Sequence, residues 1–149
     1  MPADEQIQIE DLFGTWKLVS VRRTITETGE IYDPSPDTPP SGALMYGKDG
    51  RMLVLNLTGE RPKPDSLDTI TDEQRAQLFR TMVAYGGTYT FDGQSVFHRI
   101  EISWNECWTE TAQVRRVTRD GERLVLTTAS PARSPLDGKL GTASMVWEE

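Results

Sequence analysis

The feature that most constrains this 149-residue chain is a set of turn signals that recur between short runs of β-favouring residues. Aspartate–glycine pairs stand at Asp49-Gly50, Asp92-Gly93 and Asp120-Gly121, and each is flanked by strand-like sequence. Glycine readily adopts the positive φ that a tight hairpin turn requires, so each pair predicts two antiparallel strands joined directly. Short strands with turns about every eight to twelve residues are typical of an antiparallel barrel or sandwich.

We predict an all-β protein, an antiparallel barrel of about eight strands with one α-helix across an end or side. The helix is predicted over Thr71–Tyr85, where apolar residues repeat with a helical period, a capping box begins and Gly86-Gly87 provides a stop. No repeat or linker divides residues 1–149, so we expect a single domain. The predicted strands are 14–22, 43–46, 51–55, 88–91, 95–104, 112–118, 123–128 and 144–148.

The composition argues against several classes of function. The formal charge is −7, with Asp+Glu 23 against Lys+Arg 16, and nucleic-acid binding instead requires clustered basic residues. A single cysteine, Cys107, and a single histidine, His98, provide neither an internal disulfide nor the ligands of a zinc or iron–sulfur site. The carboxylates show no calcium-loop spacing, so we expect no metal and no cofactor.

The amino-terminal segment Met1–Glu10 is acidic and has no apolar run, unlike a secretory signal or a basic transit peptide. Nowhere does the sequence approach the ~20 apolar residues that a membrane-spanning helix needs. We therefore expect a cytoplasmic protein with no membrane partner.

The opening strand, with Gly14-x-Trp16 followed by hairpins, resembles the calycin superfamily, in which the tryptophan closes one end of a barrel. A closer resemblance rests on six blocks that follow one another in the order of a known family: 12–18, 44–52, 84–89, 96–103, 113–116 with 121–126, and 146–148. In these blocks the chain resembles the small lipocalin-like domain family. It departs from the family pattern near Trp108, where Glu106 and Glu110 stand in place of a usual proline and glycine.

His98 is the strongest candidate for a catalytic residue. Alternation along strand 95–104 places it on one face with Val96, Ile100, Ile102 and Trp104, and that face is otherwise apolar. An imidazole among apolar walls can act as a general base or orient a carbonyl group. The alternative is a buried histidine that is hydrogen-bonded to a neighbouring strand.

Aromatic residues supply the candidate ligand-binding surface. A cavity lined by flat apolar rings with a few polar groups is the usual make-up of a small-molecule site. Tyr46, Tyr89 and Trp104 are predicted to bind a ligand, the two tyrosines through their hydroxyl groups. The rings that supply such area are Trp16, Tyr46, Tyr89, Trp104, Trp108 and Trp147. Most aromatic residues are nevertheless expected to be core. Trp16 in particular is assigned to a structural plug.

Two charged residues are further candidates for ligand binding. Glu101 and Arg115 lie on strands expected to be neighbours, so they could form a pair that holds an anionic or enolised ligand. The alternative is a solvent-facing ion pair of little energetic consequence. Cys107 is assigned to the rim, because extended chain separates it from His98.

These residues leave two main hypotheses for function. In the first, the barrel binds a small hydrophobic molecule, in secondary metabolism, with the proline-rich loop 32–42 and the helix gating the mouth. In the second, it is a cofactor-free cyclase or isomerase that positions a flexible natural-product intermediate. The resemblance leaves this open, because members of the lipocalin-like family sit beside small barrels that cyclise or isomerise such intermediates. An interaction module using the Trp104–Trp108 rim is disfavoured because exposed tryptophans promote aggregation. Monomer and homodimer both remain open.

Overall fold

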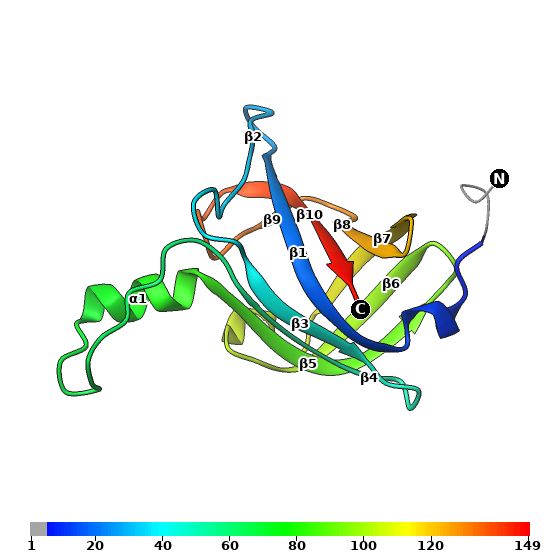
Figure 1. The fold of residues 1–149 in the computed structure, drawn as a ribbon, viewed down its shortest axis with the longest axis horizontal. Helices are drawn as coiled ribbons and strands as arrows, with labels where there is room; N and C mark the ends of the chain where they lie inside the picture. The colour runs from blue at the N-terminus through cyan, green and yellow to red at the C-terminus, as the bar shows by residue number, and fades with distance from the viewer. Residues whose placement is uncertain (1–5) are drawn as a thin grey trace.

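A computed structural model describes residues 6–149 as a curved antiparallel sheet with one α-helix (Figure 1). Residues 1–5, half of the acidic amino-terminal segment interpreted above, lie outside the described residues. Two short 3₁₀ helices cover Ile9–Leu12 and Glu106–Trp108. The α-helix and strands are β1 (Gly14–Ile25), β2 (Ile31–Tyr32), β3 (Ser41–Tyr46), β4 (Arg51–Leu57), α1 (Asp72–Arg80), β5 (Met82–Phe91), β6 (Ser95–Ser103), β7 (Ala112–Asp120), β8 (Arg123–Thr128), β9 (Ala132–Arg133) and β10 (Leu140–Glu148).

Strand pairing closes the sheet into a barrel. The strands are hydrogen-bonded in the order β1-β3-β4-β5-β6-β7-β8-β10, and β10 pairs back onto β1. Strand β1 serves both neighbours because it is long: Gly14–Lys17 pairs with β3, and Lys17–Ile25 pairs with β10. Strands β2 and β9 are two-residue additions to β1 and β10. The eight-stranded antiparallel barrel with one α-helix confirms the predicted fold class.

The three aspartate–glycine pairs form the predicted turns. Gly50, Gly93 and Gly121 have φ values of 86°, 97° and 64°, which L-residues with side chains rarely adopt. The turns join β3 to β4, β5 to β6 and β7 to β8. All three therefore gather at one end of the barrel.

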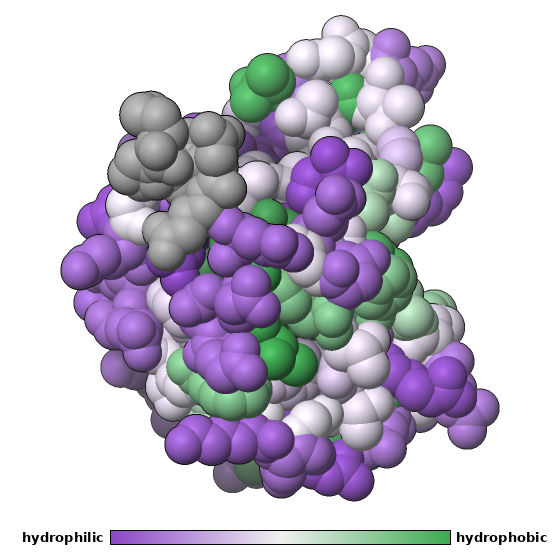
Figure 2. All heavy atoms as spheres, turned by 90° about the vertical axis from the view of Figure 1, so that its right-hand side faces the viewer, coloured by the Kyte–Doolittle hydropathy of each residue, from purple (hydrophilic) through white to green (hydrophobic). Residues whose placement is uncertain are grey.

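That end is closed by the start of the described chain. The 3₁₀ helix Ile9–Leu12 buries Leu12 completely, and the Trp16 Nε1–H donates to the Leu12 carbonyl oxygen at 2.8 Å. Asp11 forms an ion pair with Arg119 of β7 at 3.1 Å. Figure 2 views this end and shows a largely hydrophilic surface around a few apolar residues. The structure thus places Trp16 where the sequence assigned a plug.

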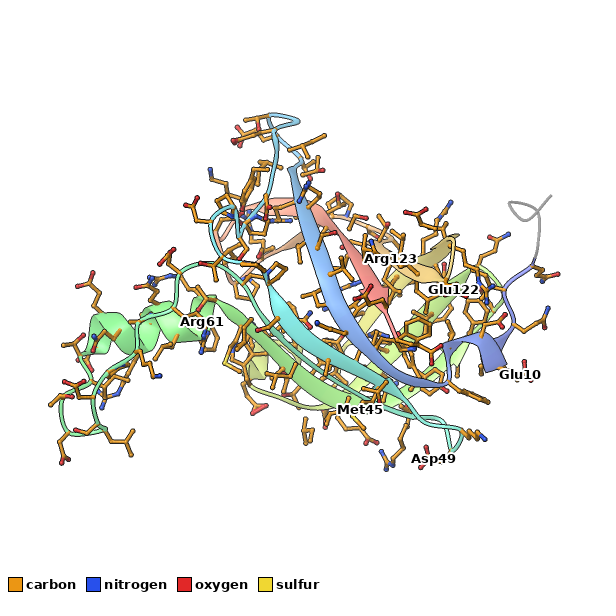
Figure 3. All side chains as sticks on the ribbon, viewed as in Figure 1. Glu10, Met45, Asp49, Arg61, Glu122 and Arg123 are labelled. Carbon is orange, nitrogen blue, oxygen red and sulfur yellow. The ribbon has the colours of Figure 1, made fainter. Side chains whose placement is uncertain are left out.

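Alternation along the strands separates the core from solvent. In β3, Leu44 and Tyr46 are 1% and 2% exposed, whereas Met45 between them is 47% exposed and lies on the outside of the barrel (Figure 3). The same period of two places apolar side chains of every long strand in the interior, as the hairpin pattern predicts.

The helix is shorter than predicted, because α1 ends at Arg80 instead of continuing to Tyr85. The predicted capping box is present: the Gln74 N–H donates to Thr71 Oγ1 at 3.1 Å, and the Thr71 N–H donates to Gln74 Oε1 at 2.9 Å. The residues after Thr81 instead enter β5 and pair with β4, because the sheet can bury their apolar and aromatic side chains. The predicted apolar stripe of the helix is not buried; α1 stands at the open end and projects away from the barrel (Figure 1).

A β-bulge at Glu101 makes the predicted alternation of β6 wrong beyond Ile100. Gly87 pairs with Ile100, whereas the preceding glycine pairs with Ile102, so Glu101 is an extra residue in the ladder. The backbones approach so closely that a Cβ on Gly87 would lie 1.9 Å from the Arg99 carbonyl oxygen. Ile102 therefore faces outward and is 66% exposed.

Candidate functional site

The barrel contains a cavity of about 140 Å³. Leu126 and Trp147 line it in the interior, and Pro34, Arg80 and the segment 132–136 line it at the end where α1 stands. It therefore opens opposite the Trp16 plug, beside the proline-rich loop and the helix. A cavity of ~150 Å³ holds a molecule of about the size of benzene, so one ring fits inside while the rest of a ligand reaches the mouth.

The charged residues that line the cavity are arginines: Arg23, Arg80, Arg115 and Arg133. Within residues 6–149, no aspartate or glutamate belongs to the lining, although the whole protein carries a formal charge of −7. Arg80 and Arg133 are exposed at the mouth, whereas Arg23 and Arg115 are only 5% and 9% exposed. The cavity is therefore a positively charged region within an acidic protein.

His98 lies deep in this cavity, between two tyrosines of different strands. Its Nε2 is 2.5 Å from the Tyr46 hydroxyl oxygen, and its Nδ1 is 2.6 Å from the Tyr85 hydroxyl oxygen. Alternation turns all three side chains into the barrel, His98 from β6, Tyr85 from β5 and Tyr46 from β3. All three side chains are at most 6% exposed. The single histidine is thus the centre of a buried tyrosine–histidine–tyrosine chain.

The pKa values define the protonation of this chain at neutral pH. Burial, reinforced by the charge of Arg115, lowers the pKa of His98 from 6.5 to about 3. Burial raises the pKa of both Tyr46 and Tyr85 above 10.0, against a smaller lowering effect of Arg115. At pH 7 the imidazole is therefore neutral and both hydroxyls are protonated.

A neutral imidazole has one N–H donor and one bare nitrogen acceptor, so one tyrosine donates to His98 and the other accepts from it. The accepting tyrosine keeps its own O–H proton for another partner. Tyr85 lines the cavity, whereas Tyr46 does not. When Nδ1 carries the imidazole proton, it donates to the Tyr85 hydroxyl oxygen. The O–H proton of Tyr85 is then free to point toward the cavity.

The other predicted aromatic ligand residues lie outside the cavity lining. Tyr46 packs against Tyr89 with ring centroids 4.6 Å apart, and the Tyr89 hydroxyl donates to the Gly47 carbonyl oxygen at 2.6 Å. Trp104 lies beside α1, where its Nε1–H donates to the Phe79 carbonyl oxygen at 3.2 Å. Their assignment to ligand binding remains a prediction.

The predicted pair of Glu101 and Arg115 does not form. Glu101 lies outside the barrel and pairs with Arg51 at 2.8 Å, whereas Arg115 faces inward opposite Val96. The register explains the difference: Arg115 lies opposite Val96 and shares its inward face, whereas regular alternation places Glu101 on the outward face of β6, beyond the last residue that pairs with β7. Of the residues predicted to form the site, His98 and Arg115 line the cavity.

Two buried polar atoms beside the cavity have no hydrogen-bond partner within residues 6–149. They are Asn56 Oδ1, an acceptor, and Trp147 Nε1, a donor. Their side chains line the cavity and are only 6% and 1% exposed. Because buried polar groups normally find partners, these atoms mark positions where a ligand or water would complete the structure.

Tyr85, Trp108, Asn56 and Trp147 belong to the cavity but were not among the predicted site residues. Tyr85 was missed because the sequence interpretation placed it in the helix. The alternation of Val83 and Tyr85 before Gly86-Gly87 is a strand-like signal that identifies its position in β5. Trp108 packs against the Tyr85 ring with centroids 6.0 Å apart.

No group of three or more His, Cys, Asp or Glu residues in the described part of the chain is placed to hold a metal ion. Cys107 is exposed. Among residues 6–149, none of the helices has the length and apolar character needed to cross a membrane.

The chain is an antiparallel β-barrel plugged at one end, and its mostly apolar cavity, open at the other end and lined by a few buried polar groups, fits the binding of a small hydrophobic molecule. The family model for the lipocalin-like domain matches residues 13–149, and the chain belongs to this family. A search of curated proteins finds no match.

Proposed function

We propose that this protein binds a small hydrophobic molecule in the cavity of its barrel. The observation that carries the proposal is an apolar cavity whose buried lining includes Asn56 Oδ1 and Trp147 Nε1, two polar atoms without a hydrogen-bond partner in the described part of the chain. Family membership supports it, because the lipocalin-like barrel suits small hydrophobic ligands. The proline-rich loop, through Pro34, and the end of α1, through Arg80, flank the mouth and would gate it.

Filling the cavity should weaken binding. Ala143 lines it, so Ala143→Phe places a ring where the ligand would lie. We expect neutral aromatic ketones, from acetophenone to 2-acetylnaphthalene, to quench tryptophan fluorescence, because Trp108 and Trp147 line the cavity. Ala143→Phe should weaken this binding about tenfold or more, since overpacking a filled site costs ~1–3 kcal/mol.

Ala112→Phe is the matched control, because Ala112 is an exposed residue of β7 outside the cavity lining. It should bind the ketones as the wild-type protein does. Equal binding by wild type and Ala143→Phe would contradict the proposed function, as would a failure of the protein to bind ketones, apolar acids and the amides of those acids alike.

The second candidate is a cofactor-free cyclase or isomerase of secondary metabolism. The hydrogen-bonded chain of Tyr46, His98 and Tyr85 favours it, because the Tyr85 hydroxyl can donate a hydrogen bond to a carbonyl oxygen and stabilise the enolate that forms when water takes an α-proton, and water then returns a proton to the carbon. His98, with its pKa near 3, would relay protons and orient Tyr85 instead of storing a proton at neutral pH.

Hydrogen exchange tests this candidate. A protein that enolises a ketone exchanges the α-hydrogens of 2-acetylnaphthalene for deuterium in D₂O, which NMR detects. We expect Tyr85→Phe to return exchange to the rate in buffer, while Tyr32→Phe leaves it unchanged, because the Tyr32 hydroxyl is bonded to Asp137 outside the cavity lining. Ketone binding without accelerated exchange would leave the protein as a binding barrel.

A further inference from the structure

Among residues 6–149, no group occupies one edge of the Arg115 guanidinium inside the barrel. Both of its hydrogen bonds use Nη1, which donates to Gln113 Oε1 and to the Val114 carbonyl oxygen at 3.2 Å each. Within residues 6–149, Nε and Nη2 have no partner and no carboxylate forms an ion pair with Arg115. We propose that the ligand of this cavity is an apolar acid whose carboxylate binds the Nε–Nη2 edge of Arg115. This inference rests on the proposed binding function and specifies its ligand class.

Arg23 is a second buried arginine of the same cavity, and its role is structural. Its guanidinium can be compared directly with that of Arg115. Arg23 Nε donates to Asp137 Oδ2 at 3.3 Å, and its Nη2 donates to Asp137 Oδ1 at 3.2 Å and to the Lys139 carbonyl oxygen at 2.6 Å. A carboxylate of the chain therefore occupies the Nε–Nη2 edge of Arg23. The equivalent edge of Arg115 lacks one, although Arg115 is nearly as buried.

A buried cation without a counter-ion is unfavourable, because removal from water is not compensated by a nearby negative charge. An acidic protein has many carboxylates to supply, yet within residues 6–149 none lines this cavity. The side-on edge of an arginine matches a carboxylate in geometry, since two parallel N–H groups meet two oxygens. A carboxylate ligand satisfies both the charge and the two donors.

The remaining lining suits such an acid. Arg80 and Arg133 at the mouth add positive charge along the approach to Arg115. Apolar residues, including Val54, Met145 and Leu126, surround the space between mouth and interior. The ring or chain of an apolar acid would fill this space.

Matched acids and amides test the proposal. We would titrate the full-length protein by calorimetry with octanoate, 4-phenylbutanoate and 2-naphthoate, each against its own primary amide, which has nearly the same shape but no charge. We expect at least one acid to bind about 10- to 100-fold more tightly than its amide, as hydrogen bonds to charged groups allow. Arg115→Gln should remove this preference, and Arg115→Lys should restore part of it, because lysine retains the charge without the fork.

Arg116→Gln is the control, because Arg116 neighbours Arg115 on β7 but faces solvent, and the change in net charge is identical. It should keep the preference for acids. The stability of the ligand-free variants separates binding from structure: Arg115→Gln should unfold at no lower urea concentration than wild type, whereas Arg23→Gln, which breaks an ion pair, should unfold at a lower one.

The outcomes distinguish the two proposals. Amides that bind as tightly as their acids would overturn the carboxylate site and leave ligand binding intact. Binding of neither the acids, the amides nor the neutral ketones would overturn ligand binding and the carboxylate site together. An acid preference that persists in Arg115→Gln would place the anion elsewhere and also overturn the assignment.

Discussion

Trp16→Ala should lower the free energy of unfolding by ~3–5 kcal/mol, the range measured when large aromatic residues are truncated in packed cores. Trp16 is 3% exposed and belongs to the main core cluster. Its Nε1–H also holds the Leu12 carbonyl oxygen, so the substitution removes an anchor of the 3₁₀ helix that covers the closed end. Urea unfolding followed by circular dichroism measures the loss.

Phe79→Ala is a suitable control, because it also truncates an aromatic ring but at a position that is 40% exposed on α1. We expect it to change the unfolding free energy by about 1 kcal/mol or less. A loss of less than about 1 kcal/mol for Trp16→Ala would show that the closed end holds without its tryptophan.

The parts of the fold that depend on neighbouring residues in the sequence were predictable. The positive φ at Gly50, Gly93 and Gly121 follows from the turn chemistry of each aspartate–glycine pair. Once these hairpins are fixed, alternation decides which side chains face inward, as in β3. The Trp16 plug followed from the resemblance to the calycin superfamily and not from this local pattern.

The start of β5 was not predictable from local pattern, because residues 81–85 satisfy both periods. Val83 continues the apolar stripe of the helix, but Val83 and Tyr85 also alternate as a strand would. Pairing with β4, which is distant in the sequence, decides in favour of the strand. The Glu101 bulge depends in the same way on the close approach of Gly87 to Arg99 across the sheet.

The sequence identified residues of the candidate site only where the pattern that marks them lies within one strand. His98 was recognisable as a polar residue on an apolar face of β6. Its partners Tyr46 and Tyr85 come from other strands, so their convergence depends on the closed barrel. For Arg115, the sequence indicated a possible role toward an anionic ligand but paired it with Glu101, because the register that places Arg115 opposite inward-facing Val96 depends on pairing between β6 and β7.

The burial of His98 should make the protein sensitive to acid well above the pH at which its carboxylates are protonated. Above pH 6.5 the imidazole is neutral in both the folded and the unfolded chain and contributes no pH dependence. Below pH 6.5 the imidazole binds a proton in the unfolded chain. In the folded protein it binds one only near pH 3, because burial and the charge of Arg115 lower the pKa of His98. Stability is therefore lost as the pH falls through this window, by on the order of 4 kcal/mol in total.

His98→Gln isolates this effect, because glutamine can still hydrogen-bond to the tyrosines but does not titrate. Between pH 7 and pH 4.5, wild type should lose ~2–3 kcal/mol more of its unfolding free energy than the variant, measured by urea unfolding at each pH. Asp92 and Asp137, whose pKa values are lowered from 3.8, contribute to acid sensitivity at lower pH and do so equally in both proteins. Equal losses in the two proteins would mean that His98 accepts a proton in the folded state. The tyrosine–histidine–tyrosine chain would then carry a positive charge beside Arg115. The assignment of a neutral imidazole would be wrong, and with it the inference that the Tyr85 O–H points into the cavity.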